Sequence, residues 1–149
     1  MKSFRVALTL ILGISSIIND SQLAQAALNT PKVGNCYNFT WTDVEGDGSN
    51  KGPVKCTSTH TAETYRVAKW DNGKGAFELT SQERWEVANR LCQPWKGNSK
   101  YLNYWAWYIP TQSQWDAGQR WVRCDAMITV SGTDPREFIS WKGKRLDVK

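Results

Sequence analysis

The sequence has little of what most catalytic and metal sites require. It contains a single histidine, His60, and no two of its four cysteines have C-x-x-C spacing, so a zinc site is not indicated. Ser58 lies close to His60, but a catalytic serine also needs a third orienting group and an oxyanion site, and no G-x-S-x-G motif is present. We therefore expect no metal, no cofactor and no enzymatic activity.

Long apolar runs are missing after the first residues. Residues 1–26 have a basic start, a short apolar core and a small-x-small end, Ala24-Gln25-Ala26, the form of a secretory signal peptide cleaved after Ala26. The apolar core stops at Asn19, short of the about 20 residues that span a bilayer, although a retained anchor is the alternative. We expect a secreted or extracytoplasmic protein without a stable membrane anchor. Residues 27–149 would form one domain, with its core at about 33–130.

Charge is not concentrated anywhere in the chain. The 19 basic and 14 acidic residues give a net charge of +5. Removal of Lys2, Arg5 and Asp20 with the signal peptide lowers this to +4, because these three residues sum to +1. Scattered, mildly basic charge is typical of ordinary solubility and also suits anionic surface polymers. We expect no nucleic-acid partner.

Alternation and capping signals predict a small α+β domain. T-x-x-E and T-x-x-Q capping boxes begin a main helix at Thr80–Trp95 and a short one at Thr111–Gly118. Pro94 is disfavoured in a helix interior, so the last regular turn of the main helix is expected near Cys92. We expect a mostly antiparallel sheet of about five strands packed by these two helices. The expected strands are Asn35–Trp41, Val54–Cys56, Glu63–Trp70, Tyr101–Ile109 and Gln119–Ile128, with an edge strand at Phe138–Trp141.

Residues 43–53 form a polar, turn-rich segment that is predicted as a solvated hairpin loop. Asp43, Glu45, Asp47 and Gly48 match the first positions of a calcium loop. The twelfth position is Val54, where a glutamate is needed. Calcium binding is therefore the weaker interpretation.

An even number of cysteines in an exported chain predicts two disulfides. Cys36 and Cys56 would join the ends of the first two strands. Cys92 on the apolar face of the main helix would bond to Cys124 on the inward face of the last strand. A crossed pairing remains open, because four cysteines allow three connectivities.

His60 and Glu63 form the strongest candidate site. His60 could act as a general base oriented by Glu63, but we favour a structural role in which it caps the turn after Cys56 and bonds to backbone or to Glu63. Arg120 is expected to hold the carboxylate of Asp116 or Glu63, with a ligand clamp as the alternative. Trp115 completes this candidate binding or structural site.

Nine tryptophans are many for this length. Trp85 and Trp95 fall on the apolar stripe of the main helix and are predicted to be core, and Trp105 and Trp107 share one strand face. Exposed aromatic rings mark a protein partner or a carbohydrate platform, whereas simple core filling is the alternative. The remaining five lie near element ends, so some are expected at the surface: Trp41, Trp70, Trp115, Trp121 and Trp141.

Several motifs follow one another along the chain: Gly34-x-Cys36-Tyr37, Val54-x-Cys56, His60-x-Ala62-Glu63, Cys92, and Pro110-Thr111 followed by Trp115, Gly118, Arg120 and Cys124. Their order resembles the septum-formation-related domain of bacterial exported and membrane-anchored proteins. The resemblance covers about Val33 to Cys124 and departs from the family pattern at Asn35, Thr59 and Gln119. It implies a link to cell division or the envelope and brings no established activity.

Three functions remain from different classes. We favour an exported, disulfide-stabilised binding or scaffold domain that contacts an envelope protein or a cell-wall glycan. The first alternative is a small secreted hydrolase that uses His60 and Glu63. The second is a secreted inhibitor or effector protein, because small, basic, disulfide-bonded domains are common in that class.

Overall fold

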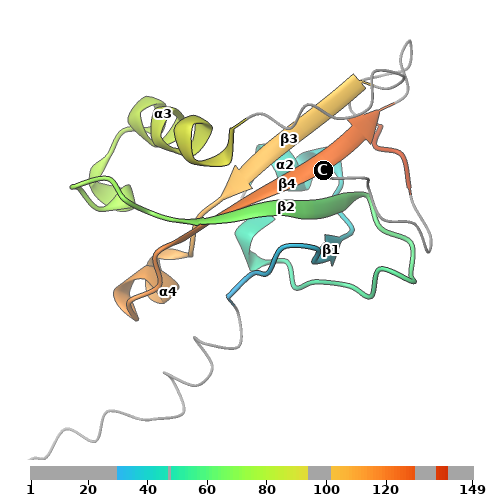
Figure 1. Ribbon diagram of the computed structural model, residues 1–149, viewed down its shortest axis with the longest axis horizontal. Coiled ribbons are helices and arrows are strands. Elements are labelled where there is room, and N and C mark those ends of the chain that lie inside the picture. The colour runs from blue at the N-terminus through green and yellow to red at the C-terminus, as the bar shows by residue number, and fades with distance from the viewer. Residues whose placement is uncertain (1–29, 47, 94–101, 130–136, 141–149) are drawn as a thin grey trace, which may run out of the picture.

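The computed structural model describes residues 30–46, 48–93, 102–129 and 137–140 (Figure 1). The signal peptide predicted for residues 1–26, Trp95 and Trp141 lie outside these ranges. In chain order the elements are β1 (Cys36–Tyr37), α2 (Trp41–Glu45), the 3-10 helix η1 (Gly48–Asn50), β2 (Ala62–Lys69), the 3-10 helix η2 (Ala76–Glu78), α3 (Ser81–Cys92), β3 (Leu102–Tyr108), α4 (Gln112–Asp116) and β4 (Trp121–Thr129).

The strands form one antiparallel sheet in the order β1-β2-β4-β3, which confirms the predicted α+β class. The sheet has four strands where about five were expected. Val54 contributes an isolated bridge to Cys36, and Phe138 another to Thr129. Central β4 is buried along its whole length, so the core lies on both faces of the sheet.

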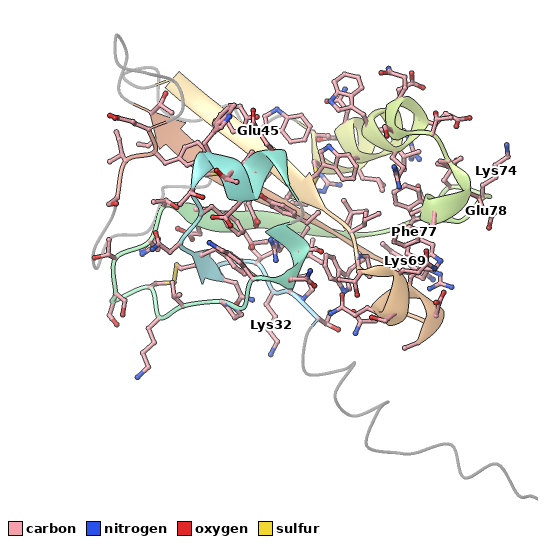
Figure 2. The ribbon with its side chains drawn as sticks, turned by 180° about the vertical axis from the view of Figure 1, so that it is seen from behind. Lys32, Glu45, Lys69, Lys74, Phe77 and Glu78 are labelled. Carbon is pink, nitrogen blue, oxygen red and sulfur yellow. A yellow bond between two sulfur atoms is a disulfide. The ribbon has the colours of Figure 1, made fainter. Side chains whose placement is uncertain are left out.

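Helices cover opposite faces of the sheet (Figures 1 and 2). On one face α3 packs its buried Val87, Leu91 and Cys92 into a cluster with Val122 and Cys124 of β4. On the other face the segment from β1 through α2 covers a second cluster, whose buried members are Tyr37, Phe39, Ala62, Ala106, Tyr108, Trp121 and Met127. Among the helices of the described ranges, none combines the length and hydropathy needed to cross a bilayer.

The first strand and the loop after it were predicted wrongly. The strand ends at Tyr37, and Thr40 begins helix α2 through a capping box with Asp43. Asp43 Oδ2 accepts hydrogen bonds from Thr40 N at 2.7 Å and from Lys51 Nζ at 2.6 Å. These bonds lower the pKa of Asp43 to about 2 against the opposing effect of partial burial. The carboxylate that would begin a calcium loop is therefore engaged within the fold.

The two ends of helix α3 were predicted correctly, but the burial of one of its tryptophans was not. The capping box between Thr80 and Glu83 is present, and the last helical residue is Cys92. Trp85, however, is 47% exposed, so its assignment to the core is wrong. The sheet meets α3 along Val87, Leu91 and Cys92, and this contact does not include Trp85.

Both predicted disulfides are confirmed. Cys36 bonds to Cys56, and Cys92 bonds to Cys124. The second bond joins α3 to β4 inside the hydrophobic cluster on that face. The first joins β1 to the loop that leads to His60.

Candidate functional site

His60 and Glu63 lie together at the start of β2, against β1. Glu63 is opposite Cys36 in the register of the two strands, and one atom each from Cys36, His60 and Glu63 lie within 4.8 Å of one another. His60 is 0% exposed and Glu63 is 1% exposed. This corner is therefore a buried cluster that includes one sulfur of a disulfide.

The hydrogen bonding of His60 defines which ring nitrogen has a free lone pair. Its Nδ1 lies 2.9 Å from the carbonyl oxygen of Ser58. A carbonyl only accepts, so Nδ1 carries the proton in this contact. Nε2 is buried, and no atom of the described residues is within hydrogen-bond distance of it. The side chain thus organises the turn after Cys56, and its second nitrogen is unsatisfied.

A hydrolase that uses this pair would need access for its substrate. A general base must come within about 3 Å of the proton it removes, and neither His60 nor Glu63 presents surface for such an approach. The geometry therefore favours the structural interpretation of this corner over the hydrolytic one.

Arg120 has partners other than those predicted. Its Nη1 donates to the backbone carbonyl oxygens of Trp115 and Gln119, the second at 2.7 Å. Its guanidinium also lies 4.2 Å from the ring centroid of Trp115. Asp116 instead accepts a hydrogen bond from Gln112 Nε2 at 2.8 Å. Arg120 thus stabilises the turn between α4 and β4, which explains why it follows the short helix.

The five predicted site residues fall into two separate groups. Glu63 lies beside His60 and pairs with Ala126 in the second half of β4. Trp115, Asp116 and Arg120 lie before β4 begins, near the other end of β2, where Lys69 pairs with Trp121. The structure does not bring these two groups into one site.

A buried ion pair was missed by the sequence analysis. Arg123 and Asp125 lie on the face of β4 that α2 covers, with side chains 2% and 0% exposed, and Arg123 Nε donates to Asp125 Oδ2 at 2.7 Å. Asp125 also accepts from the hydroxyl of Thr64 at 2.6 Å. Burial raises the pKa of the Asp125 carboxyl, while Arg123 and Thr64 act to lower it. The alternation that turned Cys124 inward was the available signal, because it places both charges on the opposite face.

Aromatic rings surround the guanidinium of Arg123. Its carbon lies 4.1 Å from the ring centroid of Tyr37, 4.5 Å from that of Tyr108 and 5.5 Å from that of Phe39. Cation–π attraction is strongest where water is excluded. We call these four residues the arginine box. It connects β1, β3 and β4 with the segment that leads into α2, and it is a structural centre.

Gly48 of η1 closes the arginine box, because a Cβ there would lie 2.6 Å from an atom of the Tyr108 ring. We expect Gly48→Ala to lower the free energy of unfolding by about 1–3 kcal/mol through overpacking. Urea denaturation measures the effect. Gly52→Ala is the matched control, since a Cβ at Gly52 meets nothing within 4 Å. Equal stability of the two variants would contradict this account of Gly48.

An open groove runs along β3. Its volume is about 790 Å³. On one flank lie Val44, Glu45 and Gly46 at the end of α2, and on the other lie Phe77 of η2 with residues from the first turn and a half of α3. Figure 2 labels Glu45 and Phe77 on these two flanks. The α3 residues of the lining are Ser81, Arg84 and Trp85. The other lining residues belong to β3 and the segment after it: Tyr104, Trp105, Ala106, Trp107, Tyr108, Ile109, Pro110, Thr111 and Gln112.

The groove explains part of the tryptophan content. Trp105 and Trp107 pack partly against the α3 cluster, as their shared strand face predicted, and both also line the groove with exposed Trp85. Trp70, Trp115 and Trp121 are buried, so these three element-end tryptophans fill the core. The sequence analysis did not single out the groove, because its walls come from segments far apart in the chain.

A family model described as "Septum formation" matches residues 33–145. The comparison with curated proteins found no match, and neither did the comparison with solved structures.

Proposed function

The chain belongs to the Septum formation family, and from that premise we propose that it is an exported, non-enzymatic binding domain of the bacterial cell envelope. Its proposed ligand is an extended segment of an envelope protein that lies along β3. The proposal rests on the groove along β3, which has one wall at α2 and another at η2 and α3. The signal-peptide pattern of residues 1–26 supports export, and the disulfides are consistent with an extracytoplasmic location.

The position of β3 in the sheet favours an extended peptide as ligand. β3 is the terminal strand and, within the described residues, pairs only with β4. An edge strand presents unpaired N–H and C=O groups to which a further strand can bond. Added strands place alternate side chains on opposite faces, and this groove has walls on both faces. A peptide would therefore gain backbone hydrogen bonds at the edge and side-chain contacts at each wall.

The composition of the walls defines the kind of peptide expected. The lining is mainly aromatic and aliphatic, with one acidic residue, Glu45, on the α2 flank and one basic residue, Arg84, on the α3 flank. Alternate apolar side chains would contact Trp85, Trp105 and Trp107. A basic residue beside α2 and an acidic residue beside α3 would complement the two charges. A glycan would use the ring faces but would leave the edge of β3 unpaired.

Selection from a displayed library of short random peptides tests this proposal on the oxidised protein. We expect enrichment of peptides with alternating apolar residues, and protection of β3 amides from hydrogen exchange in the complex. Trp85→Ser should weaken binding roughly 10- to 30-fold, because loss of an interface tryptophan typically costs about 2 kcal/mol.

Val33→Ser is the matched control, since Val33 is also exposed but does not line the groove. It should leave the affinity unchanged. Sedimentation with purified cell-wall glycan provides the competing outcome. If no peptide is enriched and Trp85→Ser abolishes binding to the glycan, the ligand of the groove is a carbohydrate and not a peptide. Peptide binding that is insensitive to Trp85→Ser would refute the groove as the site.

A further inference from the structure

We propose that reduction of the Cys36–Cys56 disulfide converts the buried corner around His60 into a zinc site. The ligands would be the two thiolates, His60 Nε2 and a carboxylate oxygen of Glu63. This inference is independent of the peptide groove, which lies along the opposite edge of the sheet at β3. It assigns a role to His60 Nε2, a buried nitrogen that has no hydrogen-bond partner among the described residues.

The expected ligand atoms already lie near one another. A ligand atom from each of Cys36, His60 and Glu63 already lies within 4.8 Å of the other two. Ligand atoms around a tetrahedral zinc are about 3.3–3.8 Å apart, given bonds of about 2.0–2.3 Å. The side chains therefore need to approach one another by no more than about 1.5 Å. The sulfur of Cys56 is held beside that of Cys36 by the disulfide itself, so a fourth ligand is at hand.

The hydrogen bonding of His60 is that of a metal-ligating histidine. A metal-ligating histidine usually donates its other ring N–H to a carbonyl or carboxylate, which orients the ring and selects the tautomer. His60 Nδ1 lies 2.9 Å from the Ser58 carbonyl oxygen, and Nε2 is buried without a partner in the described part of the chain. The lone pair of Nε2 is thus prepared for a cation. In the disulfide form Cys36 has no thiolate to offer, because its sulfur is bonded to Cys56.

The chemistry of the conversion balances with an external dithiol as reductant. The dithiol supplies two electrons and two protons, its own sulfurs become a disulfide, and the Cys36–Cys56 bond becomes two thiols. Binding of Zn²⁺ then releases both thiol protons, so that the two thiolates neutralise the charge of the metal and the Glu63 carboxylate gives the site a net charge of −1. Two sulfurs, one nitrogen and one oxygen suit Zn²⁺ better than Ca²⁺ or Mg²⁺, which prefer oxygen ligands.

The two disulfides differ in their access to a reductant. Cys56 is partly exposed, and the residues on either side of it are exposed. Cys92 and Cys124 are both buried in the core, at 1% and 0% exposure. A dithiol is therefore expected to reduce Cys36–Cys56 first and to leave the bond between α3 and β4 intact, so that the sheet and α3 remain in place.

Titration of the purified chain with Zn²⁺, before and after mild reduction by a dithiol that is then removed, tests the proposal. We expect no tight binding to the oxidised chain and a single Zn²⁺ per reduced chain. Co²⁺ substitution should give sulfur-to-metal charge transfer and the visible bands of a tetrahedral site. Near-ultraviolet circular dichroism must confirm that the reduced chain is folded. A folded, reduced chain that binds no Zn²⁺ would overturn the proposal.

Variants separate a built site from adventitious thiol binding. Glu63→Gln and His60→Gln should each weaken Zn²⁺ binding by more than about 100-fold, beyond the roughly 10- to 100-fold cost of losing an outer-shell partner. Glu86→Gln, at an exposed carboxylate of α3, should have no effect. Cys56→Ser frees the Cys36 thiol without any reductant and should bind Zn²⁺ when oxidised wild type does not. Binding that persists in both Glu63→Gln and His60→Gln would show adventitious coordination by thiols only, and would refute the site.

Discussion

Arg123→Ala is expected to lower the free energy of unfolding by about 3–5 kcal/mol, the usual result of breaking a buried ion pair. The guanidinium is 2% exposed and is bonded to Asp125, which is 0% exposed. Its removal leaves the Asp125 carboxylate with the Thr64 hydroxyl alone. It also empties the space between the Tyr37 and Tyr108 rings. Urea denaturation measures the loss directly.

Apolar replacement of Arg123, Asp125 and Thr64 together distinguishes two causes of the lost stability. One is the unpaired charge of Asp125, and the other is the cavity left by the arginine side chain. Arg123→Met combined with Asp125→Leu and Thr64→Val removes every charge and hydroxyl of the group. Apolar substitution of a buried pair is often neutral or stabilising, so this triple variant should recover most of the loss. Arg90→Ala is the exposed control, because its ion pair with Asp71 lies at the surface, and its unfolding midpoint should stay at the wild-type value. A triple variant as unstable as Arg123→Ala would show that packing, and not charge, dominates.

Loss of the Cys92–Cys124 disulfide is expected to have a similarly large effect. The bond closes a 32-residue separation, for which the loop-entropy relation gives about 3–4 kcal/mol. It also lies inside the cluster that joins α3 to β4, so truncated side chains leave a cavity. We expect Cys92→Ala/Cys124→Ala to lose about 4 kcal/mol or more in urea denaturation.

The other disulfide is the matched control for this effect. Cys36–Cys56 closes a shorter separation of 20 residues, and Cys56 is partly exposed. Cys36→Ala/Cys56→Ala should therefore cost less than the core double variant. The reverse order would contradict the view that the bond from α3 to β4 is the main covalent support of the core. It would point instead to the His60 corner as the more stabilising region.

Local sequence signals were sufficient for much of the architecture. The main helix follows from Thr80 and Glu83, because a capping box satisfies backbone N–H groups within one turn and needs nothing from the rest of the fold. Periodicity favoured the pairing of Cys92 with Cys124, because each falls on the apolar face of its own element, although a crossed pairing stayed open. The family follows from motif order between Val33 and Cys124. All of these features depend on neighbours along the chain.

The remaining features depend on contacts between distant segments, and the tertiary structure alone decides them. Trp85 satisfies the helical stripe but is exposed, because the sheet meets α3 at other residues. Arg123 and Asp125 look like surface charges in sequence, but α2 and the β1 segment cover them. Burial of a side chain is a property of the two surfaces that meet, and one segment contains only half of that information. For the same reason, the groove along β3 and the cluster at His60 become visible only after the strands have been placed side by side.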